Sequence, residues 1–308
     1  MHNLLTWAEI DLDAIGQNAS YLKRCAGPNA QLMVTVKANA YGHGMVPVAR
    51  AALSGGASWL AVHRTSEGVT LRRAGITAPI LLMGHSLPAE AERIVRWGLS
   101  PTVMTRQQAQ ALSEAAAEPN QVAGALSRVL RPPRLLRVPI HVKVDTGMGR
   151  FGLLPHEVVP FVRYLSQTPG LAVEGLYTHF AAADSPDKDF THRQFRLFMN
   201  VVEALEADGL RVPIKHAANS AATIELPEMA LEMVRCGIAL YGLDPANDPE
   251  SALPIRAALT LKSQVARVRT LPKGASVSYG RTFIASHATR VALVPVGYGD
   301  GYHRLLSN

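Results

Sequence analysis

The chain has 308 residues, 48% of them hydrophobic, which is enough for a sizeable core, and it contains no run of about 18 or more apolar residues that would span a membrane. Its net charge of +7 is scattered: the densest basic stretch, 128-RVLRPPRLLR-137, is broken by prolines and leucines, and aromatic residues make up only 6%. A nucleic-acid site needs clustered cations, often with stacking aromatics, so we expect a solvated loop there and no nucleic-acid partner. The charge is compatible with a small anionic ligand.

The N-terminal stretch MHNLLTWAEIDLD gains carboxylates early and has no basic segment ahead of an apolar one, so we expect no secretory signal. The two cysteines, Cys25 and Cys236, are too few for a disulfide framework and fit a reducing compartment. Both observations favour a cytoplasmic protein.

From residue 32 to residue 237, short apolar or β-branched runs alternate with longer segments of helical period. The expected strands are 32–36, 58–62, 79–83, 101–104, 139–144, 171–180, 213–217 and 231–237. The expected helices between them include 45–56, 65–75, 105–116 and 189–209. This alternation predicts parallel βαβ units, and eight such strands before residue 240 predict an α/β fold of the TIM type, a (β/α)8 barrel over 12–240. An open doubly wound sheet is the alternative.

The pattern changes after Tyr241. A turn-rich loop, 242-GLDPANDPES-251, is followed by 259-LTLKSQVARVRTL-271, which partly alternates polar and apolar residues, and by the strand-like 290-RVALVPVGYGDGY-302. We therefore expect residues 241–308 to form a β-rich C-terminal domain, joined by a strand from residues 1–11. Few strands are available there, too few for a self-sufficient core, so this domain is expected to be incomplete.

Lys37 ends an apolar run and is followed at once by a turn, 38-ANAYGHG-44. A lysine at a strand end commonly extends its ammonium into solvent. Alternatively, burial lowers its pKa and supplies the neutral amine that a carbonyl cofactor needs. The C-terminal ends of barrel strands carry the chemistry, which favours the second interpretation.

Barrels often bind a phosphate with the loops after strands seven and eight. The seventh expected strand is followed by 218-ANSAAT-223, with Asn219 and Ser220 at a helix start, and the eighth by 235-RCGI-238. A helix N-terminus and a glycine turn both offer backbone N–H groups to an anion. Helix capping explains Ser220 equally well. Together with Lys37, however, this phosphate site suggests pyridoxal 5′-phosphate (PLP).

The stretch 147-GMGRFG-152 matches the glycine pattern of dinucleotide-binding folds. That pattern should open the first βαβ unit and lead directly into a helix, whereas here it follows the fifth strand and Pro155 delays the helix. We prefer a tight turn that directs Arg150 into a site.

Lys143 lies inside the apolar strand 140-IHVKV-144 and needs a partner if it faces the barrel interior; Asp145 is the nearest candidate. His179, in 177-YTHFAAAD-184, is more often a core histidine than a catalyst. Neither His179 nor Asp184 has partners at metal-ligand spacing, so we expect no catalytic metal.

These residues lie in motifs that resemble the alanine racemase family, PLP enzymes with an N-terminal barrel and a C-terminal β-domain. The resemblance covers nearly the whole chain. It rests on 34-VTVKANAYGHG-44, 141-HVKVDTGMGRFG-152, 177-YTHFAAAD-184, 216-HAANSAA-222, 235-RCGIALYG-242, 277-VSYGRTF-283 and 297-GYGDGY-302.

The resemblance implies an enzyme that interconverts L-alanine and D-alanine and so supplies D-alanine for peptidoglycan. It implies that Lys37 holds PLP as an aldimine and is the acid/base on the D-alanine face. Tyr279 would be the base on the L-alanine face, contributed by the partner subunit of a homodimer. Arg150 would contact the phenolic oxygen of PLP and the substrate carboxylate. Lys143 would be carbamylated, and the resulting anion would pair with Arg150.

For the cofactor, the resemblance implies that Arg235 faces the pyridine nitrogen and is supported by His179. Tyr298 would guard the entrance to the partner's site. The phosphate would be held by Tyr41, Ser220 and the backbone of Gly237 and Ile238, with Asn219 beside them.

Members of the family continue past the glycine turn 299-GDG-301, through a Cys-Met-Asp segment that reaches the partner's site and a later tyrosine on the phosphate. This sequence has neither, and we expect a β-domain cut off within its fold and weak or absent activity of the 308 residues by themselves.

Four alternatives stay open. A racemase of broader specificity, for instance for serine, fits the same motifs. A PLP decarboxylase of related architecture favours an acidic group where Arg235 stands. A non-catalytic PLP-binding barrel has no use for Tyr279 as a second base. An NAD-dependent dehydrogenase built on 147-GMGRFG-152 is the most distant alternative.

Overall fold

The computed structural model of the chain describes residues 4–118, 137–248, 250 and 252–306. Two compact units are present, one of Leu12–Ala258 and one that combines Met1–Asp11 with Leu259–Asn308. The basic stretch 128–137 lies outside the described residues, apart from Arg137.

The boundary expected at residue 240 falls inside the first unit. The segment that follows residue 240 returns to the barrel, since the Ala258 N–H donates to the Tyr241 carbonyl at 3.0 Å. The side chain of Asn18 also donates to the Arg256 carbonyl at 2.8 Å and accepts the Arg256 N–H at 2.9 Å. These hydrogen bonds explain why the unit extends to Ala258.

The first unit is built on an eight-stranded parallel sheet in the order β8-β7-β6-β5-β4-β3-β2-β9. Between β9 and β8 the Arg235 N–H donates to the Ala218 carbonyl at 2.9 Å. This sequential order confirms the predicted (β/α)8 barrel rather than a doubly wound sheet. The strands are β2 (Gln31–Thr35), β3 (Trp59–Val62), β4 (Ile80–His85), β5 (Ser100–Thr102), β6 (Val138–Lys143), β7 (Leu171–Tyr177), β8 (Ile214–His216) and β9 (Met233–Cys236).

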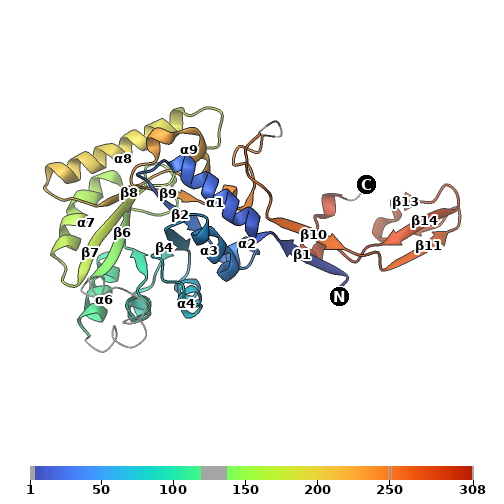
Figure 1. The fold of residues 1–308 in the computed structure, drawn as a ribbon, viewed down its shortest axis with the longest axis horizontal. Coiled ribbons are helices and arrows are strands. Elements are labelled where there is room, and N and C mark those ends of the chain that lie inside the picture. Colours follow the sequence, from blue (N-terminus) through green and yellow to red (C-terminus); the bar gives the residue numbers. More distant parts are fainter. Residues whose placement is uncertain (1–3, 119–136, 249, 251, 307–308) are drawn as a thin grey trace. The chain divides into compact units, whose positions relative to one another are not determined.

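Helices surround this sheet (Figure 1). In α1 the residues Ala14, Ile15, Ala19 and Leu22 are buried, a spacing that places them on one face of the helix. The helices are α1 (Leu12–Ala26), α3 (Met45–Ser54), α4 (Thr65–Arg73), α5 (Ala91–Arg96), α6 (Arg106–Ala117), α7 (Pro155–Gln167), α8 (Asp189–Ala207) and α9 (Ser220–Glu225).

Both faces of the barrel strands are buried, which explains their continuous apolar sequences. In β2, Leu32 and Val34 belong to the large core under the helices, whereas Met33 packs inside the barrel. In β3, Trp59 and Ala61 point inward in the same way. Inside the barrel lie Met33, Trp59, Ala61, Leu81, Ile214 and Met233.

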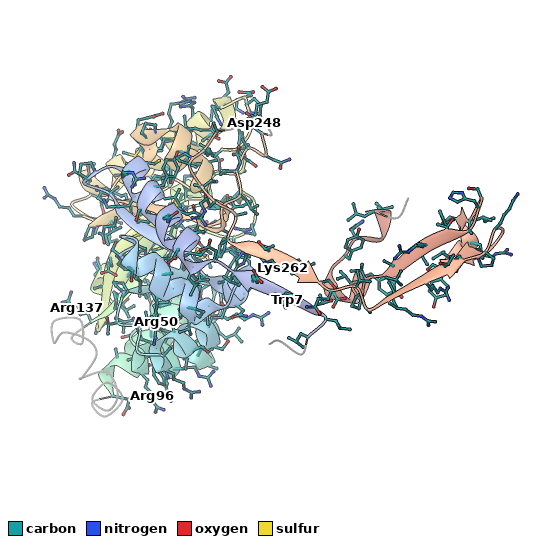
Figure 2. All side chains as sticks on the ribbon, turned by 45° about the vertical axis from the view of Figure 1, so that its right-hand side comes forward. Trp7, Arg50, Arg96, Arg137, Asp248 and Lys262 are labelled. Atoms are coloured by element: carbon teal, nitrogen blue, oxygen red, sulfur yellow. The ribbon has the colours of Figure 1, made fainter. Side chains whose placement is uncertain are left out.

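The second unit consists of antiparallel strand pairs. They are β1 (Thr6–Ile10) with β10 (Leu259–Ser263), β11 (Arg267–Leu271) with β14 (Thr289–Leu293), and β12 (Ser276–Val277) with β13 (Phe283–Ile284). Trp7 pairs with Lys262, both labelled in Figure 2, and the Lys262 ammonium forms an ion pair with Glu9 at 2.7 Å. The strand expected over 290–302 ends at Leu293, and a 3₁₀ turn follows at Tyr298–Asp300, closed by Gly301 with φ of 88°.

Within the described ranges, none of the helices combines the length and the apolar character needed to cross a bilayer. Surface cations of the barrel unit lie on separate elements: Arg50 on α3, Arg96 on α5 and Arg137 before β6 (Figure 2).

Candidate active site at the mouth of the barrel

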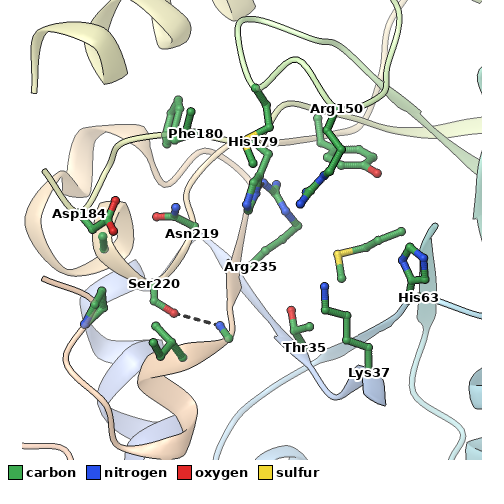
Figure 3. Close-up of a pocket in the computed structure, with 18 of the residues that line it drawn as sticks. Thr35, Lys37, His63, Arg150, His179, Phe180, Asp184, Asn219, Ser220 and Arg235 are labelled. Carbon is green, nitrogen blue, oxygen red and sulfur yellow. Dashed lines mark hydrogen bonds between the residues drawn. The ribbon is translucent and has the colours of Figure 1, made fainter. Parts of the chain in front are cut away.

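A cavity of about 630 Å³ lies in the barrel unit (Figure 3). Several of its lining residues follow the C-terminal ends of barrel strands, where the fold carries its chemistry. Every residue that the sequence indicated for the site within the barrel lines this one cavity. They are Lys37, Tyr41, Lys143, Arg150, His179, Asn219, Ser220, Arg235, Gly237 and Ile238.

Lys37 follows β2, and its side chain is directed into the cavity (Figure 3). Its Nζ lies 5.9 Å from the centre of the Tyr41 ring. Burial, followed by the positive charge of Arg150, lowers the pKa of Lys37, while Glu67 opposes this shift. The amine is thus biased toward the neutral form that a nucleophile requires.

Ser220 and Gly237 close the opposite side of the cavity. The Gly237 N–H donates to Ser220 Oγ at 2.9 Å, drawn as a dashed line in Figure 3. Asn219 precedes α9 and its Oδ1 accepts the Ala222 N–H at 3.1 Å, so Asn219 is the helix cap. The loops after β8 and β9 are thereby joined into a cradle in which hydroxyl and backbone N–H groups lie close together, which suits an anion.

Arg235, on β9, is 4% exposed and makes hydrogen bonds in several directions. Nη2 donates to the carbonyls of Thr178 at 2.6 Å and Ala217 at 2.9 Å. Nη1 lies 2.9 Å from His216 Nδ1, and Nη2 lies 3.4 Å from His179 Nδ1. These bonds hold the guanidinium rigidly at the cavity wall.

Burial is the main cause that lowers the pKa of both histidines around Arg235, to about 3 for His179 and well below the ordinary value for His216. The charge of Arg235 adds to this shift in each case. Burial also lowers the pKa of Arg235 itself, to about 10, so it stays charged near neutral pH. Neutral histidines can accept from a guanidinium, which only donates.

The hydrogen-bond network continues under the cavity through residues that lie in the sequence motifs but to which the sequence assigned no role. His216 Nε2 lies 2.9 Å from His141 Nδ1, and the His216 ring stacks on Tyr177 with centroids 4.8 Å apart. His141 Nε2 in turn lies 3.7 Å from Glu174 Oε2. One signal was available: His141 and Lys143 are two residues apart in a strand, so both face the barrel interior.

Lys143 is 1% exposed, and its Nζ donates to the Phe151 carbonyl. Burial, together with the charges of Arg150 and Arg235, lowers the pKa of Lys143 to about 8, although Asp145 acts in the opposite sense. A lone buried ammonium among cations is costly. The site therefore shifts Lys143 toward the neutral amine, which predominates only above about pH 8.

The glycine-rich segment 147–152 is a loop that carries Arg150 to the cavity, as the sequence interpretation preferred. Gly147, Gly149 and Gly152 have φ of 131°, 66° and 129°, values that suit glycine. Asp145 Oδ1 accepts the N–H groups of Gly147 and Gly149 at 3.0 and 3.1 Å. The turn is thus built into the backbone, and α7 begins only at Pro155.

Tyr279 and Tyr298 belong to the second unit. Tyr279 is 86% exposed and begins a short 3₁₀ segment, Tyr279–Arg281. Ser278 before it and Gly280 and Arg281 after it have positive φ. Tyr298 is 78% exposed. Strained backbone of this kind is concentrated at functional positions.

Family models and named relatives match this chain over nearly its whole length. The family model for the alanine racemase N-terminal domain matches residues 10–245, and that for the alanine racemase C-terminal domain matches residues 258–308. The alanine racemase of Halothermothrix orenii is 41% identical over 303 residues, which cover 98% of this chain and 76% of that protein.

Solved structures of alanine racemases are also similar to this chain. The alanine racemase of Clostridium difficile 630 has a TM-score of 0.87 at 34% identity and covers 99% of this chain, with 76% of its own length matched. The alanine racemase of Bacillus anthracis, solved with bound L-Ala-P, has a TM-score of 0.85 at 34% identity over 98% of this chain and 75% of that one. The matches span both units of the chain.

Proposed function

The chain belongs to the alanine racemase family, and from this we propose that it binds PLP at Lys37 and uses it to interconvert L-alanine and D-alanine. Racemisation of alanine is the activity of its relatives, and an alanine-like ligand, L-Ala-P, occupies one of their structures. The observation that carries the proposal is the meeting of Lys37, Arg235 and the Ser220–Gly237 cradle in one cavity.

The residues present fit PLP at each of its polar groups. The half-buried amine of Lys37, with its lowered pKa, suits the aldehyde. The Ser220 hydroxyl and the backbone of Gly237 and Ile238 suit the phosphate, and Tyr41, which also lines the cavity, would contribute to holding it. When bound, PLP withdraws electrons from the Cα–H bond of an amino acid so that the proton can be removed.

Arg235 would face the pyridine nitrogen of PLP. A guanidinium has donors only, so it holds the facing nitrogen as an acceptor and keeps it unprotonated. The neutral His216 on Arg235 Nη1 and the backbone carbonyls on Nη2 prevent the side chain from turning away. A PLP decarboxylase is expected to have an acidic residue at this place, whereas this chain has a fixed cation, Arg235.

Racemisation needs two proton carriers on opposite faces of the substrate carbon. We assign the D-alanine face to Lys37 and the L-alanine face to Tyr279. Arg150, exposed at the cavity, would bind the substrate carboxylate and the phenolic oxygen of PLP. Tyr279 would come from the partner subunit of a homodimer, with the partner's Tyr298 at the entrance.

The product of the reaction in one direction is D-alanine, which we propose is used for peptidoglycan. Both described cysteines, Cys25 and Cys236, are free thiols, which supports a cytoplasmic location.

We expect Lys143 to be carbamylated. Above its pKa of about 8 the amine is largely neutral and can add carbon dioxide with loss of one proton, which gives an anion beside Arg150 and Arg235. After equilibration with carbon-13 bicarbonate, the protein should show a carbamate resonance at pH 8 to 9 that fades as the pH falls and the amine is protonated. Lys143→Ala should lack it, and Lys215→Ala, whose ammonium pairs with Glu232, should retain it. A parent protein without the resonance contradicts the expectation.

The proposed function is tested by adding PLP to the purified chain and reducing it with borohydride. We expect a yellow protein before reduction and PLP joined to the Lys37 peptide after it, as located by mass spectrometry. L-alanine and L-serine are then offered in parallel, and formation of D-alanine in excess of D-serine supports the assigned substrate. A protein that stays colourless after addition of PLP refutes the cofactor assignment.

A further inference from the structure

The backbone immediately after Lys37 is left-handed. Ala38, Asn39, Ala40 and Tyr41 all have φ between 51° and 54°, a conformation that costs a non-glycine residue about 1–2 kcal/mol. Such backbone persists only where the surrounding structure holds it, and it is concentrated at functional sites. The turn sets the direction in which the chain leaves the end of β2. Whatever holds the turn therefore also constrains the backbone from which the Lys37 side chain extends.

Glu67, on α4 of the next βα unit, binds this turn. Its Oε1 accepts the Ala38 N–H at 2.6 Å. Its Oε2 accepts the N–H groups of His63 and Arg64, at 2.9 Å each. Hydrogen bonds to an ionised carboxylate are roughly twice as strong as neutral ones. One half-buried side chain thus ties the residue after Lys37 to the first turn of α4.

Helix capping alone does not explain this contact. Glu157 shows what a capping glutamate does elsewhere in the barrel unit: its Oε2 accepts the N–H of Leu154, at the start of its own helix, at 2.7 Å. The bonds of Glu67 to His63 and Arg64 are of that kind. Its bond to Ala38 instead reaches a different loop, the one that carries Lys37.

Resting on the proposed function, we infer that Glu67 is a positioning residue for Lys37, which fixes the left-handed turn and so aims the amine into the cavity. Glu67 is not among the described residues that line the cavity, so it acts through Ala38. The negative charge of Glu67 opposes this positioning role, because it favours the protonated form of Lys37. Burial and Arg150 lower the pKa of Lys37, and Glu67 raises it. Glu67 also contributes, after burial, to the raised pKa of Tyr41, which faces the same amine.

Removal of the carboxylate changes charge and position together, with opposite consequences for Lys37. Loss of charge alone makes the Lys37 amine more neutral and more reactive toward PLP. Loss of the hydrogen bond to Ala38 releases the turn and makes the Lys37 amine less available to PLP. We expect the loss of position to outweigh the loss of charge in its effect on the yield of modified Lys37.

The test compares the full chain with Glu67→Gln, Glu67→Asp and the matched control Glu157→Gln. Each protein is incubated with subsaturating PLP and reduced with borohydride, the modified Lys37 peptide is quantified, and thermal unfolding is followed in parallel. Glu67→Asp keeps the charge but is too short to reach both loops. We expect both Glu67 variants to yield about tenfold less modified Lys37, the effect of one lost hydrogen bond to a charged group. Glu157→Gln should match the parent yield despite a similar change in unfolding temperature.

An increased yield in Glu67→Gln, or a parent-like yield in Glu67→Asp, would show that charge dominates and would overturn the inference. An equal loss in Glu157→Gln would make Glu67 an ordinary helix cap, with the same consequence. If the parent chain itself forms no adduct on Lys37, the proposed function fails together with the inference, and that result is distinct from the others.

Discussion

Lys37→Ala is expected to abolish covalent attachment of PLP and to lower racemisation relative to the parent chain by about 10²- to 10⁴-fold, the range for loss of a general acid/base. The substitution removes the amine that, in the proposed function, would react with the aldehyde and would carry the proton on the D-alanine face. Arg235 and the Ser220–Gly237 cradle stay in place, so PLP should still bind, without a covalent bond.

The measurement is the borohydride-fixed fraction of PLP together with the rate of D-alanine formation. Lys215→Ala is the control, because its ammonium forms an ion pair with Glu232 and does not line the cavity. Parent-like attachment of PLP to another lysine in Lys37→Ala, with racemisation retained, would contradict the assignment.

Tyr279→Phe is expected to lower racemisation by a similar factor of about 10²–10⁴ while leaving the PLP adduct on Lys37 nearly unchanged. The substitution keeps the ring and removes the hydroxyl that would carry the proton on the L-alanine face. In deuterium oxide, exchange of the α-proton of D-alanine should continue through Lys37, whereas exchange of the α-proton of L-alanine should stop. Equal losses of adduct and racemisation would instead give Tyr279 a structural role.

The two variants also test whether the site is shared between subunits. Mixed in equal amounts and allowed to exchange subunits, Lys37→Ala and Tyr279→Phe should regain activity. A mixed dimer then has one site with both native residues, and about a quarter of all sites in a random mixture are of this kind. If both residues of a site came from one chain, mixing would restore nothing.

Most of the barrel could be predicted from the sequence because its strands are buried on both faces and read as continuous apolar runs. The expected strand at 32–36 is β2 (Gln31–Thr35), and that at 58–62 is β3 (Trp59–Val62). The prediction was wrong where a composition typical of strands also occurs in turns. Residues 290–302 look strand-like in composition, but the backbone leaves the strand after Leu293 and turns at Gly301.

For the site, the sequence by itself indicated candidate residues that the structure places at the cavity, such as Lys37 and Ser220, because each lies in a local motif at the end of an apolar run. Only the tertiary structure decided that Glu67, His141 and His216 join them. Their partners are distant in sequence: Glu67 reaches Ala38 across a loop, and the curvature of the sheet brings His141 on β6 against His216 on β8. A motif records local constraints, whereas a hydrogen bond between different βα units exists only once their strands have assembled into the curved sheet.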